Sequence, residues 1–401
     1  MPESQTPSIP WISGMNSMTR THVNIHLEDV PTPCYLVDEV ALEDNLKILD
    51  SVQKTAECRV LLALKGFAMW HFAPLIRRYL AGASASSLDE ARLAFEELGK
   101  EVHVCGAGYS DAHFQEMIQY ADHIVFNSFS QYRRLRAFLK NAPRPIECGI
   151  RINPEYSEVA TPIYDPCYPC SRLGVTLDRF EPDALEGICG LHFHCLCEQD
   201  AGVLERVLGA AEKKFGRFFK GLKWVNFGGG HHITKPGYDV EALCRMISSF
   251  KARYGVDVYL EPGEAIALNT GILVSSVLDV VENRMQIAIL DASAATHMPD
   301  VLEMPYRPEI IGGGEPQTRA HTFRLAGPSC LAGDVIGDYS FDQPLAVGNK
   351  LIFLDMAHYT MVKNNTFNGI RLPSIGVFNS RTGEVRIIRT FGYEDYRNRL
   401  S

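Results

Sequence analysis

The sequence lacks the features that mark several classes of protein. It has no apolar run close to the roughly 20 residues that a membrane-spanning helix requires, so we expect no membrane-spanning segment. It also lacks an excess of positive charge, because 39 lysines and arginines face 48 acidic residues, which gives a net charge of −9. This balance argues against a nucleic-acid-binding protein and is compatible with a cationic small substrate. Residues 1–25 lack the apolar stretch of a signal peptide, and we expect them to form a disordered polar extension.

The cysteines lack the even spacing of a disulfide framework, although the chain contains 11 of them. A reduced, cytoplasmic location is therefore expected. One cluster contains residue types that bind zinc, since Cys167 and Cys170 precede the stretch His192–Cys197. However, it contains only one Cys-x-x-Cys pair, and alternate side chains of a strand face opposite sides. We therefore predict no metal site.

Most of the chain, from about residue 34 to residue 262, alternates short β-prone runs with amphipathic helical stretches. The predicted strands are Val60–Leu64, Val102–Cys105, His123–Phe126, Glu147–Ile152, Ile188–His194, Trp224–Phe227 and Val256–Leu260. The predicted helices include Leu88–Leu98, Ser110–Tyr120, Ser128–Leu139, Ala201–Phe218 and Val240–Tyr254. This alternation is typical of a parallel α/β architecture. Its length predicts a (β/α)8 barrel, with an open doubly wound sheet as the alternative.

The pattern changes after residue 263, where β-prone runs are separated by Gly, Pro and Asp turns. The predicted strands here are Ile272–Val281, Met285–Leu290, Thr322–Leu325, Lys350–Leu354, Ile375–Phe378 and Val385–Thr390. They predict a C-terminal antiparallel β-domain. The predicted organisation is therefore an extension at 1–25, a barrel at 26–265 and a β-domain at 266–401.

Four chemically suggestive features follow predicted strands, where the active site of a barrel lies. They are Lys65, His194, the triplet Gly228-Gly229-Gly230 and Glu261. Each has a simpler explanation: a lysine that reaches water, a core histidine, a tight turn or an acid that caps a neighbour. Together they describe a pocket for pyridoxal phosphate. Lysine forms a Schiff base, glycine amides approach a phosphate, an acid holds a proton on the pyridine nitrogen and an imidazole stacks on the ring.

The β-domain contributes two further candidates. Cys330 lies in a loop rich in Gly and Pro, where a thiol has no obvious packing role. The alternative is a small buried side chain in a turn. Tyr359 is either a core residue or a hydroxyl that reaches the phosphate.

The chain resembles the fold-type III pyridoxal phosphate decarboxylases, which are barrels related to alanine racemase. Within that group it is most similar to the carboxynorspermidine decarboxylases. The motifs that carry the resemblance run from about residue 30 to the C-terminus. They are Ala63-Leu64-Lys65-Gly66, Leu191-His192-Phe193-His194, Phe227-Gly228-Gly229-Gly230-His231-His232, Glu261-Pro262-Gly263-Glu264-Ala265, Ser329-Cys330-Leu331-Ala332-Gly333-Asp334 and Asn364-Asn365-Thr366-Phe367-Asn368-Gly369.

The resemblance implies pyridoxal phosphate as cofactor and a head-to-tail homodimer with shared active sites. It further implies that Lys65 carries the cofactor as a Schiff base and that His194 stacks on its ring. Glu261 would pair with the pyridine nitrogen. The implied phosphate contacts are Gly228, Gly229, Gly230 and Tyr359. The residues expected to enter from the partner subunit are Cys330, as a catalytic group, and Asp334, at the substrate.

One departure from the wider family predicts the substrate. Ornithine and diaminopimelate decarboxylases usually carry Arg after Glu-Pro-Gly, whereas this chain has Glu264. A carboxylate suits a cationic substrate rather than a phosphate. The implied substrate is carboxynorspermidine or carboxyspermidine, with Asp300 and Glu303 as further candidate contacts. For those two residues a solvated acidic loop is the alternative.

Three other functions remain open. One is a decarboxylase or racemase of the same fold that acts on diaminopimelate, ornithine or alanine. Another is a non-catalytic homologue that binds the cofactor or a regulatory partner. The third is a zinc-dependent barrel hydrolase, which would leave Lys65 and Glu261 unexplained.

Overall fold

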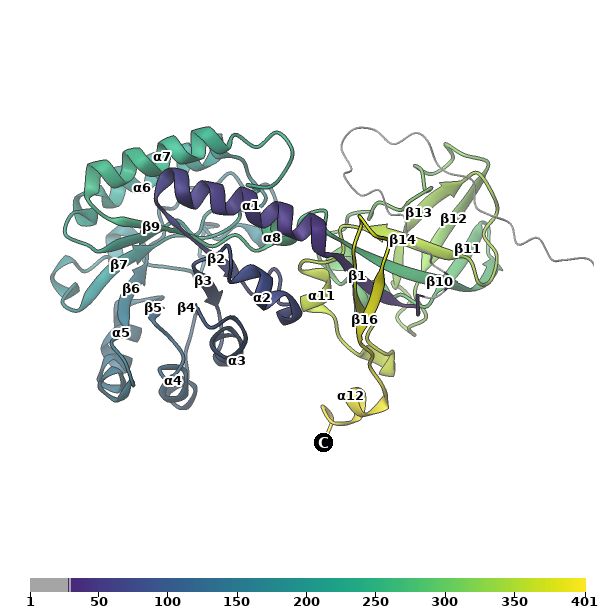
Figure 1. Ribbon diagram of the computed structural model, residues 1–401, viewed down its shortest axis with the longest axis horizontal. Helices are drawn as coiled ribbons and strands as arrows, with labels where there is room; N and C mark the ends of the chain where they lie inside the picture. The colour runs from purple at the N-terminus through teal and green to yellow at the C-terminus, as the bar shows by residue number, and fades with distance from the viewer. Residues whose placement is uncertain (1–27, 29) are drawn as a thin grey trace, which may run out of the picture.

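The computed structural model describes residue 28 and residues 30–401. The predicted extension at residues 1–25 lies outside the described residues. The chain forms two lobes that lie side by side, with a barrel at the left of Figure 1 and a sheet domain at the right. Among the described residues, no helix is both long and apolar enough to cross a membrane.

The first lobe is a closed barrel of eight parallel strands, in which each strand pairs with the next and the last pairs with the first. The strands are β2 (Arg59–Ala63), β3 (Gly82–Ala85), β4 (Glu101–Cys105), β5 (His123–Phe126), β6 (Glu147–Arg151), β7 (Ile188–His192), β8 (Trp224–Asn226) and β9 (Asp257–Leu260). The predicted barrel is confirmed, and the open doubly wound sheet is excluded.

The strand β3 is the barrel strand that the sequence pattern does not predict. Its residues Gly-Ala-Ser-Ala are small and not β-branched, so they give no β signal. The structure explains the small residues, because a Cβ on Gly82 would lie 2.1 Å from the carbonyl oxygen of Glu101 in β4. The close approach of the two strands therefore requires glycine at this position.

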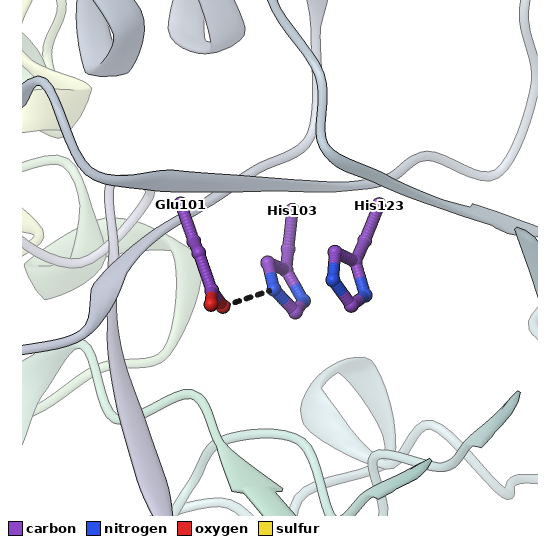
Figure 2. A group of neighbouring side chains, drawn as sticks. All are labelled: Glu101, His103 and His123. Atoms are coloured by element: carbon purple, nitrogen blue, oxygen red, sulfur yellow. Dashed lines mark hydrogen bonds and ion pairs between the residues drawn. The ribbon is translucent and has the colours of Figure 1, made fainter. Parts of the chain in front are cut away.

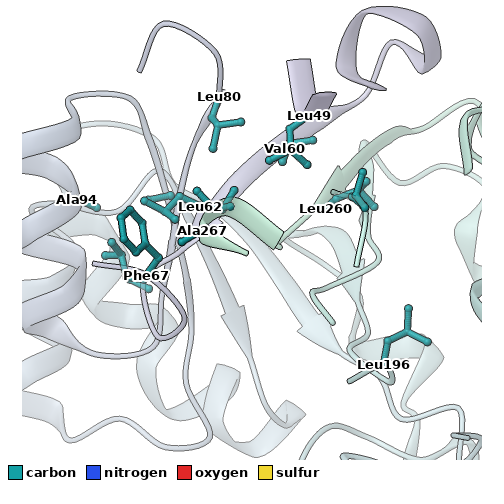
Figure 3. Packing of buried hydrophobic residues seen from close by; sticks show 14 of the residues in the cluster. Leu49, Val60, Leu62, Phe67, Leu80, Ala94, Leu196, Leu260 and Ala267 are labelled. Atoms are coloured by element: carbon teal, nitrogen blue, oxygen red, sulfur yellow. The ribbon is translucent and has the colours of Figure 1, made fainter. Parts of the chain in front are cut away.

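Eight α-helices accompany the barrel strands in the described chain, and most of them cover the outside of the barrel (Figure 1). They are α1 (Glu39–Ala56), α2 (Ala73–Ile76), α3 (Leu88–Leu93), α4 (Asp111–Met117), α5 (Phe129–Leu135), α6 (Ala201–Phe219), α7 (Val240–Tyr254) and α8 (Glu264–Ala267). The helix α1 shows which features of the sequence produce a helix here. Asp38 caps α1 by accepting a hydrogen bond from the Val40 amide, and Leu42, Leu46 and Leu49 repeat at helical spacing on its buried face. In Figure 3, Leu49 lies beside Val60 of β2 in the core between helix and barrel.

The second lobe is an eight-stranded sheet with the order β13-β12-β11-β10-β1-β15-β16, in which β14 pairs with β10. Its strands are β1 (Cys34–Asp38), β10 (Gly271–Glu282), β11 (Gln286–Leu290), β12 (His321–Ala326), β13 (Val335–Phe341), β14 (Lys350–Leu354), β15 (Ser374–Phe378) and β16 (Val385–Arg389). Four short helices accompany them: α9 (Ala294–His297), α10 (Asp300–Glu303), α11 (Thr360–Lys363) and α12 (Tyr393–Arg397).

The sheet domain differs from the predicted antiparallel domain in two respects. The sheet is mixed, because β1 pairs with β15, and β11 with β12, in parallel. In addition, β1 comes from the N-terminal side of the predicted boundary at residue 265 and pairs with β10. The described chain therefore runs from β1 in the sheet domain through α1 to the barrel and returns to the sheet domain after β9. This double crossing fixes the two lobes against each other and positions the site between them.

Candidate active site

A cavity of about 680 Å³ lies at the C-terminal ends of the barrel strands, where the sheet domain covers them. A cavity of this size can bury a cofactor together with a small substrate. Both lobes line it. The predicted site residues found in its wall are Lys65, His194, Gly230, Glu261, Glu264, Asp300 and Tyr359.

Lys65 follows β2 and exposes its side chain to the cavity rather than to the outer surface. Burial beneath the two lobes lowers the pKa of its amine, and the nearby Arg151 charge lowers it further, while Glu261 acts in the opposite direction. A lysine with a lowered pKa is a better nucleophile toward a carbonyl at neutral pH. Lys65 therefore has the environment that a Schiff-base lysine requires.

Glu261 follows β9 and is buried at the base of the cavity. The side-chain amide of Asn226, from β8, donates to its Oε1 at 2.8 Å, and His192, from β7, donates to its Oε2 at 3.2 Å. Burial alone would raise the pKa of Glu261, but the charge and hydrogen bond of His192, with smaller contributions from His103 and Asn226, lower it to about 2. Glu261 is therefore an ionised carboxylate in the interior of the protein.

His194 is held as a neutral, flat ring. Its Nδ1 accepts a hydrogen bond from the amide of Gly229 at 2.9 Å, and burial lowers its pKa well below the usual value. The amide of Gly228 in turn donates to the side chain of Asn226 at 2.8 Å. Two amides of the triplet thus orient side chains instead of pointing into the cavity. Of the three glycines, Gly230 alone lines it.

The backbone of Gly230 also shows why a side chain is not tolerated there. Its φ is +83°, and a Cβ would lie 2.1 Å from the carbonyl oxygen of Leu196. The bare backbone leaves room for a ligand at this edge. A nucleophilic amine, a neutral stacking ring, an ionised buried acid and this open glycine edge together fit pyridoxal phosphate.

The other end of the cavity is acidic. Glu264 lies 3.2 Å from Nε2 of His232 and 3.9 Å from Nε2 of His358, and Asp355 lies 3.1 Å from the same atom of His358. Glu198 also lines the cavity and has no salt bridge within the described chain. Burial alone would lower the pKa of His358, but the Asp355, Glu264 and Glu198 carboxylates raise it to about 9. Three carboxylates therefore face one imidazolium.

Tyr359 is held at the junction of the lobes. Its amide donates to the carbonyl of Gly66 at 2.7 Å, next to Lys65, and its φ is +42°. A positive φ in a non-glycine residue costs roughly 1–3 kcal/mol and is retained where the surroundings enforce it.

Four predicted substrate or catalytic residues have other surroundings in this chain. Asp300 lines the cavity but bonds to Tyr164 at 2.9 Å and to Lys363 at 2.6 Å. Glu303 pairs with the same lysine and does not line the cavity. Asp334 is buried and accepts a hydrogen bond from Ser293 at 2.8 Å. Cys330 is exposed on its loop, away from the cavity wall of its own chain.

Comparisons with known proteins agree with this geometry. The family model described as "Pyridoxal-dependent decarboxylase, C-terminal sheet domain" matches residues 34–357. A carboxyaminopropylagmatine decarboxylase from Synechocystis is 50% identical over 94% of this chain and 97% of its own. A carboxynorspermidine/carboxyspermidine decarboxylase from Campylobacter jejuni is 44% identical over 92% of this chain and 98% of its own.

This chain belongs to the pyridoxal-dependent decarboxylases.

A solved structure supports the same assignment. The crystal structure of the carboxynorspermidine decarboxylase from C. jejuni, complexed with norspermidine, has a TM-score of 0.85 and 43% identity, and covers 92% of this chain and 100% of its own. A diaminopimelate decarboxylase from Helicobacter pylori has a TM-score of 0.75 at 19% identity, which shows the shared fold alone.

Several residues of this decarboxylase site were not predicted from the sequence. His192 and Asn226 support Glu261 from neighbouring strands, and only their alternation with core residues could have indicated inward-facing side chains. Asp355 and His358 are three residues apart, but Glu198 lies more than 150 residues before them, and no motif spacing connects it to them. They meet because the sheet domain folds over the barrel.

The raised pKa of His358 generates a pH-dependent stability. Because the folded-state pKa of about 9 exceeds the usual 6.5, the folded protein binds this proton more tightly. The contribution is complete below pH 6.5 and is lost as the pH rises through 9, and it amounts to at most about 3 kcal/mol. In urea unfolding, the wild type should lose more free energy of unfolding between these pH values than His358→Asn. Parallel pH profiles for the two proteins would contradict the assigned ion pairs.

Proposed function

We propose that this protein decarboxylates an amino acid whose side chain is a polyamine, and that carboxynorspermidine and carboxyspermidine are its substrates. The products are norspermidine and spermidine. The observation that carries the proposal is the acidic end of the cavity, with Glu198, Glu264 and Asp355, beside a lysine that suits a Schiff base. The names of the similar decarboxylases point to the same class of substrate.

The amino-acid head of the substrate is proposed to react at Lys65. Bound pyridoxal phosphate supplies an electron sink for the electron pair that remains when the carboxylate leaves as CO2. Lys65 provides the amine that anchors the cofactor. Glu261, ionised and buried, holds a proton on the pyridine nitrogen. His194 supplies a neutral face for the ring, and Gly230, with Tyr359, is proposed to lie at the phosphate.

The polyamine tail is proposed to extend toward Glu264 and Glu198. Its amines are cationic at neutral pH, and three carboxylates, those of Asp355, Glu264 and Glu198, surround the His358 imidazolium. Lys363 compensates Asp300 and Glu303, so these two contribute less net charge than the sequence suggests. An Arg in place of Glu264 would repel the tail, which supports a polyamine rather than a small diamino acid.

A second substrate is favoured by one observation. The relative that shares 50% identity is named for carboxyaminopropylagmatine, whose tail ends in a guanidinium group instead of an amine. Carboxylates accept the forked hydrogen bonds of a guanidinium as well as the contacts of an ammonium. The acidic end of the cavity thus suits either tail.

We further propose a head-to-tail homodimer in which the partner subunit's Cys330 reaches the substrate and donates a proton to Cα. Cys330 is exposed, and its amide donates to the side chain of Asn368 at 2.9 Å, which holds the loop in place. Leu331 and Phe367 lie exposed in the neighbouring segments of chain, at 44% and 43%. Exposed apolar residues around a thiol support an interface at this surface.

A cytoplasmic location is part of the proposal. All 11 cysteines are free, and Cys34, Cys58 and Cys148 are buried. A reducing compartment preserves such thiols.

The substrate proposal is tested by CO2 release from carboxynorspermidine, carboxyspermidine, carboxyaminopropylagmatine and meso-diaminopimelate. We expect kcat/KM for at least one polyamine substrate to exceed that for diaminopimelate by roughly 100-fold or more, because the small substrate leaves buried carboxylates unpaired. Lys65→Ala should lose both CO2 release and the visible absorbance of the bound cofactor. Equal or faster turnover of diaminopimelate would contradict the proposed specificity.

The shared site is tested by complementation. Lys65→Ala and Cys330→Ala, each carrying a different affinity tag, are co-expressed and the mixed dimers are isolated by tandem purification. Each variant alone should lose most of its activity, whereas the mixed dimer should regain about half of the wild-type value, because one of its two sites is intact. Mixed dimers that stay inactive, or a fully active Cys330→Ala, would refute the shared site.

A further inference from the structure

A second cluster of polar side chains lies at the opposite end of the barrel from the active site. It consists of Glu101 and His103 on β4 and His123 on β5; Glu101 and His123 begin their strands, and His103 is the third residue of β4. Register places His103 directly opposite His123. Figure 2 shows the three side chains side by side, all projecting in the same direction from their strands. None of the three lines the decarboxylase cavity.

The two histidines of this cluster are buried and incompletely bonded. His103 is 1% exposed and His123 is 7% exposed. Their rings stack 3.9 Å apart at an angle of 12°. Among the described residues, Nδ1 of each ring has no hydrogen-bond partner. A buried polar atom without a partner costs roughly 1–3 kcal/mol, so native proteins contain few of them. Two adjacent ones indicate a ligand that the protein atoms alone do not provide.

The geometry of the three side chains fits a metal ion. One donor atom from each residue lies within 4.8 Å of the others. Nε2 of His103 is 3.2 Å from Oε2 of Glu101. Two ligands of a tetrahedral zinc ion lie roughly 3.3 Å apart when each is 2.0–2.1 Å from the metal. Because the lone pairs of two stacked imidazoles run parallel, the His123 ring would have to turn out of the stack to complete the third contact.

The local charges also permit a cation. Arg59 pairs with Oε1 of Glu101 and bonds to the Tyr259 hydroxyl at 2.8 Å, which leaves Oε2 directed at His103. Lys223 is paired with Glu147 at 2.5 Å. Both neighbouring cations are therefore compensated.

We propose that Glu101, His103 and His123 bind a divalent transition-metal ion, with zinc preferred for two imidazoles and one carboxylate. The ion would link β4 to β5 within the barrel. It is a structural site that is separate from the decarboxylase cavity. Among the described residues, one further group has a spacing that fits a metal, Glu198, His232 and Glu264, and it belongs to the wall of the decarboxylase cavity.

Metal analysis of the cofactor-loaded protein tests this inference. The protein is treated with a chelator, dialysed against zinc and then against metal-free buffer. The wild type should retain roughly one zinc ion per chain, and Glu101→Gln and His123→Asn should each lose it. His113→Asn is the matched control, because His113 is exposed on α4, and it should retain the zinc. A wild type without zinc, or equal retention in His123→Asn and His113→Asn, would overturn the proposal.

A second measurement does not depend on the stability of one variant. Zinc that binds only the folded state should raise the Tm of the wild type and of His113→Asn by a few degrees, and should not raise that of Glu101→Gln. When cobalt replaces zinc, the wild type should show the visible absorbance bands of a tetrahedral cobalt ion, and Glu101→Gln should not. Equal Tm shifts in the wild type and Glu101→Gln, or cobalt bands that persist in Glu101→Gln, would overturn the proposal.

Discussion

The rest of the site depends on one buried ion, the carboxylate of Glu261. An unpaired carboxylate in a protein interior is costly and would normally take up a proton. Here His192 and Asn226, from the two strands that precede β9 in the barrel, each donate to one of its oxygens. This arrangement needs three neighbouring strands in register. It also explains why Asn226 accepts from the amide of Gly228, because the side chain must be oriented before it can donate to the acid.

The cavity has two regions with different charges, one around Glu261 and Lys65 and the other around Glu264. Around Glu261 and Lys65 the protein provides one acid, one amine and a neutral imidazole, which suit a cofactor ring. Around Glu264 it provides carboxylates in excess, partly compensated by the His358 imidazolium. A substrate with an amino-acid head and a cationic tail matches both regions at once. The sheet domain supplies Asp355 and His358, so the tail region exists only when the two lobes are packed together.

Much of the barrel could be predicted because many of its strands are short apolar runs between segments with clear helical periodicity, as in Val60–Leu64. The strand Gly82–Ala85 could not, since its small residues are selected by a close approach to β4 that only the folded barrel reveals. The pairing of β1 with β10 could not be predicted either, because it joins segments more than 230 residues apart in the sequence.

The candidate site shows the same division. Lys65, His194, Glu261 and Glu264 follow strands or strand-like motifs, and they converge on one cavity as the parallel barrel requires. Asp300 and Glu303 could not be judged from sequence, because their partner Lys363 lies some 60 residues away. Asp334 was expected at the substrate, yet its carboxylate is buried in its own chain and accepts a hydrogen bond from Ser293. Sequence motifs therefore predict where a residue lies along the fold, but they do not predict which side chains it bonds to.

The role of the Glu261 charge is tested most directly by the turnover of carboxynorspermidine in the variant Glu261→Gln. Glutamine keeps the size and a hydrogen-bonding oxygen but cannot hold a proton on the pyridine nitrogen. We expect the variant to bind the cofactor, as its visible absorbance will show, while kcat for CO2 release falls by roughly 100-fold or more. A kcat within a few-fold of the wild type in the cofactor-loaded variant would contradict the central role of the Glu261 charge.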